Sequence, residues 1–261
     1  MTPASGSTAR LRAVSATRYV EALREGGSVP GLMEADDDGL YVVKMRGAAQ
    51  GVAALVAEVV VGELARALGF RTPDLVTVQV DLELARAEPD PEIQELVAKS
   101  AGVNLGVDFL PGALPFTPAA ISSIDPELAA DIVWLDALTT NPDRTARNPN
   151  LLVWHRNPWL IDHGAALYRQ HGERPLADTA QDPFPMLGSH ILLRAAGSIA
   201  AADERLADRA RSAAGLAVEL VPEQWLGPQP AARRADLAGF FERRLSSPRQ
   251  FVEEAELARG K

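Results

Sequence analysis

The stretch that decides the fold runs from residue 141 to residue 164. It opens with Asn141-Pro142-Asp143-Arg144-Thr145-Ala146-Arg147-Asn148 and closes with Ile161-Asp162-His163-Gly164. Between these two motifs, the β-rich runs 151–155 and 159–162 are joined by Arg156-Asn157-Pro158, which predicts a hairpin. Asp143 and Asn148 therefore share one loop, and the hairpin returns Asp162 to their side.

This spacing is typical of phosphoryl transfer with a metal ion. That chemistry needs a carboxylate near the acceptor hydroxyl, an amide oxygen on the metal, and a second carboxylate that holds the metal against the nucleotide phosphates. Asp143, Asn148 and Asp162 supply these groups in this order. Each piece alone favours ordinary turn chemistry, so the functional interpretation depends on what lies upstream.

Upstream lies a candidate ion pair between Lys44 and Glu58. Lys44 stands in the β-rich run 40–45, which follows a turn at Asp37-Asp38-Gly39. Glu58 is the lone acid in the apolar stretch 53–62 of a helix predicted over 52–68. Because a buried carboxylate is costly without a cation, we expect Glu58 to pair with Lys44. A purely structural pair fits the same pattern, and the downstream motifs favour the functional reading.

Composition limits the possible functions. The chain has 261 residues, 26 Lys and Arg against 35 Asp and Glu, a net charge of -9 and no cysteine. The length suits one large domain or two lobes around a cleft, and the missing cysteines exclude disulfides, thiolate metal sites and cysteine nucleophiles. No basic stripe supports nucleic-acid binding, and no apolar run is long enough to cross a bilayer. We expect a cytoplasmic protein without nucleic-acid or membrane partners.

The order of predicted elements divides the chain at Pro111-Gly112. Residues 1–110 are expected to form a small α+β lobe, and residues 111–261 a mostly helical one. The first lobe has a short helix over 17–24, a loop over 28–32, the strand and helix described above, strands over 74–82 and 103–110, and an irregular excursion over 86–96. In the second, helices are expected over 128–139, 191–199, 202–220 and 231–245.

Several motifs, in order and spacing, resemble the HipA-like kinases, in particular the short members with a single kinase domain. The resemblance extends from about Gly26 to about His190. The motifs that carry it are Gly26-Gly27-Ser28, Tyr41-Val42-Val43-Lys44, the Glu58 helix ending in Leu64-Ala65-Arg66-Ala67-Leu68-Gly69, Trp134-Leu135-Asp136-Ala137-Leu138, Asn141-Pro142-Asp143-Arg144, Asn148-Pro149-Asn150 and Leu160-Ile161-Asp162-His163-Gly164. Two positions depart from the family pattern, where Thr145 replaces a common His and His163 replaces an apolar residue.

The resemblance implies an α+β, two-lobed protein-kinase-like fold. Its small N-terminal lobe would have an antiparallel sheet and one helix, its C-terminal lobe would be mostly helical, and ATP and Mg²⁺ would bind between them. The implied roles are as follows: Lys44 holds the α/β-phosphates and pairs with Glu58, Asp143 is the base, Asn148 and Asp162 bind Mg²⁺, and the hinge at Asp108, Phe109, Leu110 and Pro111 offers backbone groups to adenine. Gly27 and Ser28, with the loop 47–51, either donate amides to the phosphates or are simple turns.

The acceptor is less defined. The resemblance favours a Ser or Thr hydroxyl on a protein, while the same motifs also resemble antibiotic and small-metabolite kinases. A nucleotide-binding scaffold without transfer is the alternative from another class. The four histidines lack zinc spacing, and His163 and His190 are expected in or near the core. Ser189 and Thr179 are possible phosphate acceptors in the loop 169–190.

Overall fold

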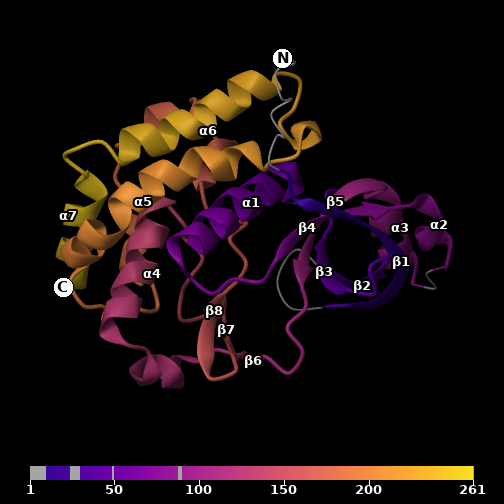
Figure 1. Ribbon diagram of the computed structural model, residues 1–261, viewed down its shortest axis with the longest axis horizontal. Helices are drawn as coiled ribbons and strands as arrows, with labels where there is room; N and C mark the ends of the chain where they lie inside the picture. Colours follow the sequence, from indigo (N-terminus) through magenta and orange to yellow (C-terminus); the bar gives the residue numbers. More distant parts are fainter. Residues whose placement is uncertain (1–9, 24–29, 49, 88–89, 261) are drawn as a thin grey trace, which may run out of the picture.

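A computed structural model describes residues 10–23, 30–48, 50–87 and 90–260. Five of its strands form a closed barrel at one end of the molecule (Figure 1). In spatial order they are β1 (Arg12–Ala22), β2 (Gly31–Ala35), β3 (Leu40–Lys44), β5 (Gly102–Asp108) and β4 (Leu75–Val80). Neighbours pair antiparallel, except that β1 closes the barrel by pairing parallel with β4. The expectation of an antiparallel sheet is therefore wrong at this closing pair.

The helix expected over residues 17–24 is also wrong, because residues 17–22 belong to β1. Tyr19 lies opposite Met33 of β2, and Val14 lies opposite Val78 of β4. Thr, Tyr and Val side chains favour a pleated strand when partners are available on both sides. The expected loop over 28–32 overlaps the start of β2, because Gly31 and Leu32 pair with Val43 and Val42 of β3.

Two short helices replace the irregular excursion between β4 and β5. They are α2 (Leu82–Ala87) and α3 (Pro91–Lys99). The Asp90 carboxylate accepts a hydrogen bond from the Glu92 amide, and Pro91 occupies the first turn, so α3 begins with a favourable cap. The prediction of a single helix in the small N-terminal lobe is therefore wrong, because α2 and α3 are two further helices.

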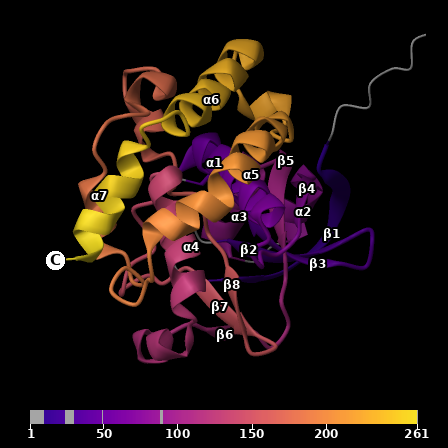
Figure 2. The ribbon, with the colours of Figure 1, turned by 60° about the vertical axis from the view of Figure 1, so that its left-hand side comes forward.

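The predicted helix over residues 52–68 is confirmed as α1 (Gly51–Leu68). It ends at Gly69, whose φ of 93° lies in the left-handed region that glycine adopts without strain. α1 directly follows the barrel strand β3 and packs against α5 (Ile199–Glu219), as both ribbon views show (Figures 1 and 2). Glu58 therefore belongs to the helical part of the molecule, and Lys44 to the barrel.

The rest of the helical part comprises α4 (Pro126–Leu138), α6 (Pro230–Arg244) and α7 (Gln250–Arg259). A small sheet of β6 (Leu114–Pro115), β7 (Leu151–Trp154) and β8 (Asn157–Leu160) lies beside them and contains the predicted hairpin. The 3₁₀ helices are η1 (Pro118–Ser123), η2 (Tyr168–His171), η3 (Leu176–Thr179), η4 (Pro185–Ser189) and η5 (Glu223–Trp225). Within the part of the chain that the structure describes, none of the helices is long and apolar enough to cross a membrane.

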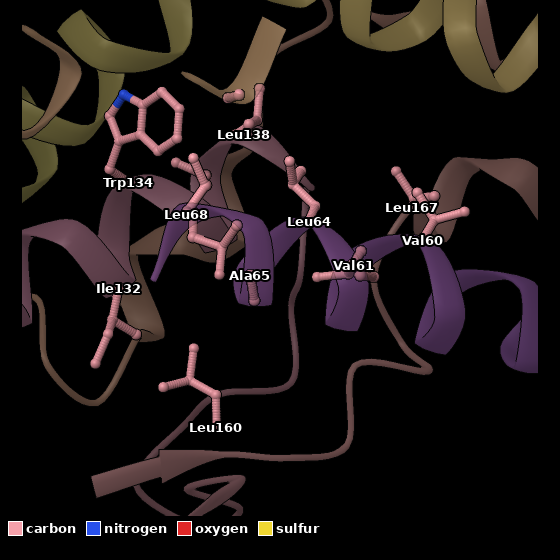
Figure 3. Close-up of a cluster of buried hydrophobic side chains, with 14 of the residues drawn as sticks. Val60, Val61, Leu64, Ala65, Leu68, Ile132, Trp134, Leu138, Leu160 and Leu167 are labelled. Atoms are coloured by element: carbon pink, nitrogen blue, oxygen red, sulfur yellow. The ribbon is translucent and has the colours of Figure 1, made fainter. Parts of the chain in front are cut away.

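Two hydrophobic clusters fill these two regions. One lies around the barrel strands and includes Met33, Val43 and Val78. The other joins α1 to the remaining helices, and Figure 3 shows Leu64 and Leu68 of α1 close to Trp134 and Leu138 of α4. Most side chains of α1 are buried, which explains why its sequence is almost continuously hydrophobic.

Residues 191–198 do not form the expected helix. The backbone of His190 bridges to Thr145, and the Ile191 amide donates to the Arg144 carbonyl at 3.0 Å, so this segment is attached to the loop after α4. α5 begins only after Ser198, whose hydroxyl accepts a hydrogen bond from the Ala201 amide. The helix expected over 202–220 is confirmed within α5, and α7 is an additional helix.

Candidate active site

Lys44, Glu58 and Asp162 form one group, called here the Lys44 cluster. The Lys44 Nζ atom lies 2.7 Å from Glu58 Oε2 and 2.7 Å from Asp162 Oδ1. Both bonds satisfy the geometry of charge-assisted hydrogen bonds. The predicted Lys44–Glu58 ion pair is confirmed, and the structure adds Asp162 to it.

Each member reaches the cluster from a different element. Lys44 is the last residue of β3, and the alternation of the strand keeps the neighbouring side chains of Val43 and Met45 in the barrel core. Glu58 projects from the middle of α1 and is almost fully buried. Asp162 follows β8 with a φ of 54°, a left-handed conformation that residues other than glycine adopt rarely. Such backbone is retained where surrounding contacts hold it.

The two carboxylates set the charge state of Lys44. Burial by itself lowers the pKa of the ammonium group, but the charges of Glu58 and Asp162 outweigh it and raise the pKa to about 12. The positive charge of Lys44 in turn lowers the pKa of Asp162. Lys44 and Asp162 are therefore both ionised at neutral pH.

The catalytic-loop candidates lie together after α4. The Asn148 and Asn150 side-chain amides donate to Asp143 Oδ2 at 2.8 and 3.1 Å, and the Asp143 amide donates to Asn141 Oδ1 at 3.1 Å. Among the described residues, Asp143 Oδ1 has no hydrogen-bond partner, so one oxygen is free to accept a proton. Burial raises the pKa of Asp143, the two asparagines lower it, and the nearby charge of Asp162 raises it further.

A second charged group lies under this loop, and we call it the Asp136 hub: Asp136, Asn141, Arg144 and His190. Asp136 is buried in α4, and its carboxylate accepts hydrogen bonds from Asn141 Nδ2 at 3.0 Å, Arg144 Nε at 2.5 Å and His190 Nε2 at 2.9 Å. Burial acts to raise the pKa of Asp136, but Arg144 and His190 outweigh it and hold the pKa well below its usual range.

The hub is the buried charged group that sequence reasoning missed. Asp136 stands in a quoted motif, yet no role follows from the motif itself. A single acid within an apolar stretch is the signal that singled out Glu58, and Asp136 carries the same signal in the stretch 132–138. The predictions that His163 and His190 lie in the core are confirmed, since both are buried. Thr179 is also buried, with its hydroxyl bonded to the Leu176 carbonyl, whereas Ser189 is exposed.

Two side-chain oxygen atoms of this site are suitable ligands for a magnesium ion. Asn148 uses its Nδ2 toward Asp143, which leaves its Oδ1 without a hydrogen-bond partner among the described residues, and Asp162 likewise has Oδ2 free. An amide oxygen and a carboxylate oxygen suit Mg²⁺, which keeps waters and phosphate oxygens as its other ligands. The described residues contain no group of three or more His, Cys, Asp or Glu that could hold a metal by itself.

A small pocket opens beside Asp162. Lys44 and Asp162 line it together with Gln50, Gly51 and Gly164. Gln50 precedes the first turn of α1, which has no acidic residue and no side-chain cap, so the positive end of the helix faces this space. A cation and a helix N-terminus without a side-chain cap in one pocket suit a phosphate group.

Gly27 and Ser28, predicted at the phosphates, fall outside the described residues. The predicted hinge residues lie at the end of β5 and just after it. Asp108 ends β5 opposite Tyr41, its amide donates to the Asp74 carbonyl, and the Phe109 amide donates to the Leu40 carbonyl. Leu110 is buried just beyond. Their role at a hinge stays a prediction.

The comparisons with known proteins agree with the geometry. The model of a family described as HipA-like kinase matches residues 17–239. The solved structure of a Helicobacter pylori proinflammatory kinase, CtkA, superposes with a TM-score of 0.57 over 92% of this chain and 94% of that one. The two chains are 13% identical, so the likeness concerns the fold. No curated protein sequence matches the chain.

Proposed function

The chain belongs to the HipA-like kinase family and is a phosphotransferase, and we propose that it transfers the γ-phosphoryl group of ATP, with Mg²⁺, to a Ser or Thr hydroxyl of a protein. The observation that carries this proposal is the Lys44 cluster. One ammonium group lies 2.7 Å from a carboxylate of α1 and 2.7 Å from a carboxylate that follows β8. The strand cation, the helix acid and the metal-binding acid of a kinase site have this relation.

Each residue has a definite task in this proposal. Lys44 binds the α- and β-phosphates, and Glu58 holds the ammonium group of Lys44 in the pocket. Asp143 accepts the proton of the acceptor hydroxyl through its free Oδ1, while Asn148 and Asn150 fix the carboxylate through Oδ2. The hydroxyl oxygen forms its bond to the γ-phosphorus as the bond to the β–γ bridging oxygen breaks, and ADP leaves.

Asn148 Oδ1 and Asp162 Oδ2 would hold the magnesium ion, which neutralises phosphate charge when it is bound. The pocket at the start of α1 supports the loop 47–51 as a phosphate-binding segment, and Gly27 and Ser28 remain proposed amide donors to the phosphates. The hinge would be Asp108, Phe109 and Leu110, with the lobe boundary after residue 110. Since Asp108 and Phe109 already use their amides within the barrel, adenine would meet the Leu110 amide.

The test is a magnesium-dependent label transfer. The purified protein is incubated with γ-labelled ATP, with and without EDTA, alone, with casein, and with the protein and small-molecule fractions of a cell extract. Label on protein that EDTA prevents supports the proposal. Label in the small-molecule fraction alone would instead assign a metabolite kinase. Absence of both magnesium-dependent ATP binding and transfer would overturn the proposed function.

A further inference from the structure

Asp136 makes contacts that a helix residue of the core does not need for packing. Its side chain is 0% exposed, and it accepts bonds from three residues on two different segments. Asn141 and Arg144 belong to the loop that carries Asp143, and His190 ends the segment of η4. A single carboxylate thus joins α4, the Asp143 loop and the η4 segment.

Arg144 extends the hub toward the rest of the candidate site. Its guanidinium also donates to the Asn150 carbonyl and lies 3.5 Å from His163 Nδ1. Asn150 holds Asp143, and His163 follows Asp162 directly. Through one guanidinium, the carboxylate of Asp136 is therefore connected to both halves of the site.

The hydrogen-bond directions of the hub require a carboxylate. The Leu192 amide donates to His190 Nδ1 at 3.1 Å, so the ring proton is on Nε2 and points at Asp136. Arg144 and Asn141 can only donate from the atoms that face Asp136. An amide in place of the carboxylate would turn an NH₂ group toward one of these donors and leave it unpaired.

We propose that Asp136 is the positioning residue of the active site: it fixes the Asp143 loop against α4 and against the η4 segment, so that the base and the metal ligands keep one relative orientation. The inference rests on the proposed function. Asp136 does not itself touch substrate. Its removal would displace the base, and misplacement by about 1 Å is enough to lower a rate roughly 100-fold.

A matched control lies on α5. Asp203 is likewise a buried carboxylate that accepts from one guanidinium and one ring N–H, namely Arg249 Nε at 2.8 Å and Trp134 Nε1 at 2.9 Å. Its partners belong to α4 and to the residue before α7, away from the Asp143 loop. Asp203→Asn therefore removes a buried charge of the same kind without touching the positioning contacts.

The experiment compares wild type, Asp136→Asn and Asp203→Asn below their melting temperatures. Transfer from γ-labelled ATP to casein gives kcat, calorimetric titration gives the Kd for Mg-ATP, and hydrogen exchange reports amide protection. For Asp136→Asn we expect kcat to fall about 100-fold with the Kd changed less than about 3-fold, and faster exchange over residues 141–150 and 186–191. For Asp203→Asn we expect near wild-type kcat and unchanged exchange over those residues.

Equal kcat and equal loop protection in the two variants would overturn the inference. If wild type transfers no label, the proposed function fails, and hydrogen exchange alone then decides whether Asp136 anchors the loop. Should Asp136→Asn not fold, His190→Phe removes the donor of one hub bond and keeps Arg144 paired with Asp136. A drop in kcat for His190→Phe without a matching change in Kd supports the inference, and wild-type kcat contradicts it.

Discussion

The Lys44 cluster joins a cation to two carboxylates and the Asp136 hub joins a cation to one, but only the hub is sealed from solvent. The side chains of Asp136 and Arg144 are 0% exposed, whereas those of Lys44 and Asp162 are 16% and 47% exposed. The cluster also connects the barrel with the helical part, while the hub lies wholly within the helical part. The difference separates two tasks: a half-open cluster can exchange its partners with a nucleotide, and a buried hub can only hold its partners in place.

The largest expected effect comes from the open cluster. Asp162→Asn should lower transfer by on the order of 1,000-fold, because the amide loses the charge that would hold the metal. Its melting temperature should change little, because Asp162 is half exposed. Label transfer and thermal unfolding measure the two quantities.

A suitable control for that variant is Asp182→Asn. Asp182 pairs with Arg169 and Arg174 on the surface, outside the Lys44 cluster. It should keep wild-type transfer. Equal loss of activity in Asp162→Asn and Asp182→Asn would remove the distinction between the site and its surroundings.

The next largest effect concerns stability. Here a substitution in the Asp136 hub should cost more unfolding free energy than one in the Lys44 cluster. Arg144→Met should cost about 3–5 kcal/mol of unfolding free energy, because it leaves the buried Asp136 without its cation. Lys44→Met should cost less, because burial already raises the pKa of Glu58 and lets it take up a proton. Denaturant unfolding of both variants gives the comparison, and a larger loss for Lys44→Met would contradict it.

A pH series sharpens the same contrast. The folded pKa of Asp136 is lowered, so its stabilisation is complete above the usual carboxyl range and is lost as the pH falls toward the folded value. The stability difference between wild type and Asp136→Asn should therefore be constant near neutral pH and shrink from about pH 4 downward. Urea unfolding at several pH values measures it, and a difference that grows on acidification would be the opposite result.

The smallest expected effect concerns Glu58→Gln. Gln keeps the shape of Glu58, and Asp162 still pairs with Lys44, so transfer should fall by only about 10-fold. The Kd for Mg-ATP should rise in parallel, because the ammonium group is less firmly held. A loss as large as that of Asp162→Asn would mean that Glu58 does more than position Lys44.

The local sequence pattern is sufficient to predict those elements whose packing or pairing partners are close along the chain. α1 is predictable because an apolar run ends at Gly69, and the hairpin of β7 and β8 because its strands are joined by a short turn. The local pattern of β1 predicts a helix, and it is wrong because the pairing of β1 with β2 and β4 depends on closure of the barrel and not on the residues of β1 alone. The parallel β1–β4 pair in particular joins residues more than 60 positions apart.

The candidate site divides in the same way. Lys44 and Glu58 could be paired from the sequence because the single acid of the apolar stretch 53–62 needs a cation. The sequence could not give the contact of Lys44 with Asp162, which lies 118 residues away. Nor could the sequence give the His190 bond to Asp136, which spans 54 residues. Where a buried charge finds its partner is decided by tertiary packing.

The most direct test of the central claim is label transfer by Asp143→Asn. The amide cannot accept the hydroxyl proton, but Lys44, Asn148 and Asp162 remain to bind Mg-ATP. The account predicts a Kd for Mg-ATP within about 3-fold of wild type and a loss of transfer of roughly 100-fold or more. Transfer at the wild-type rate would show that Asp143 is not the base and would contradict the assignment of the site.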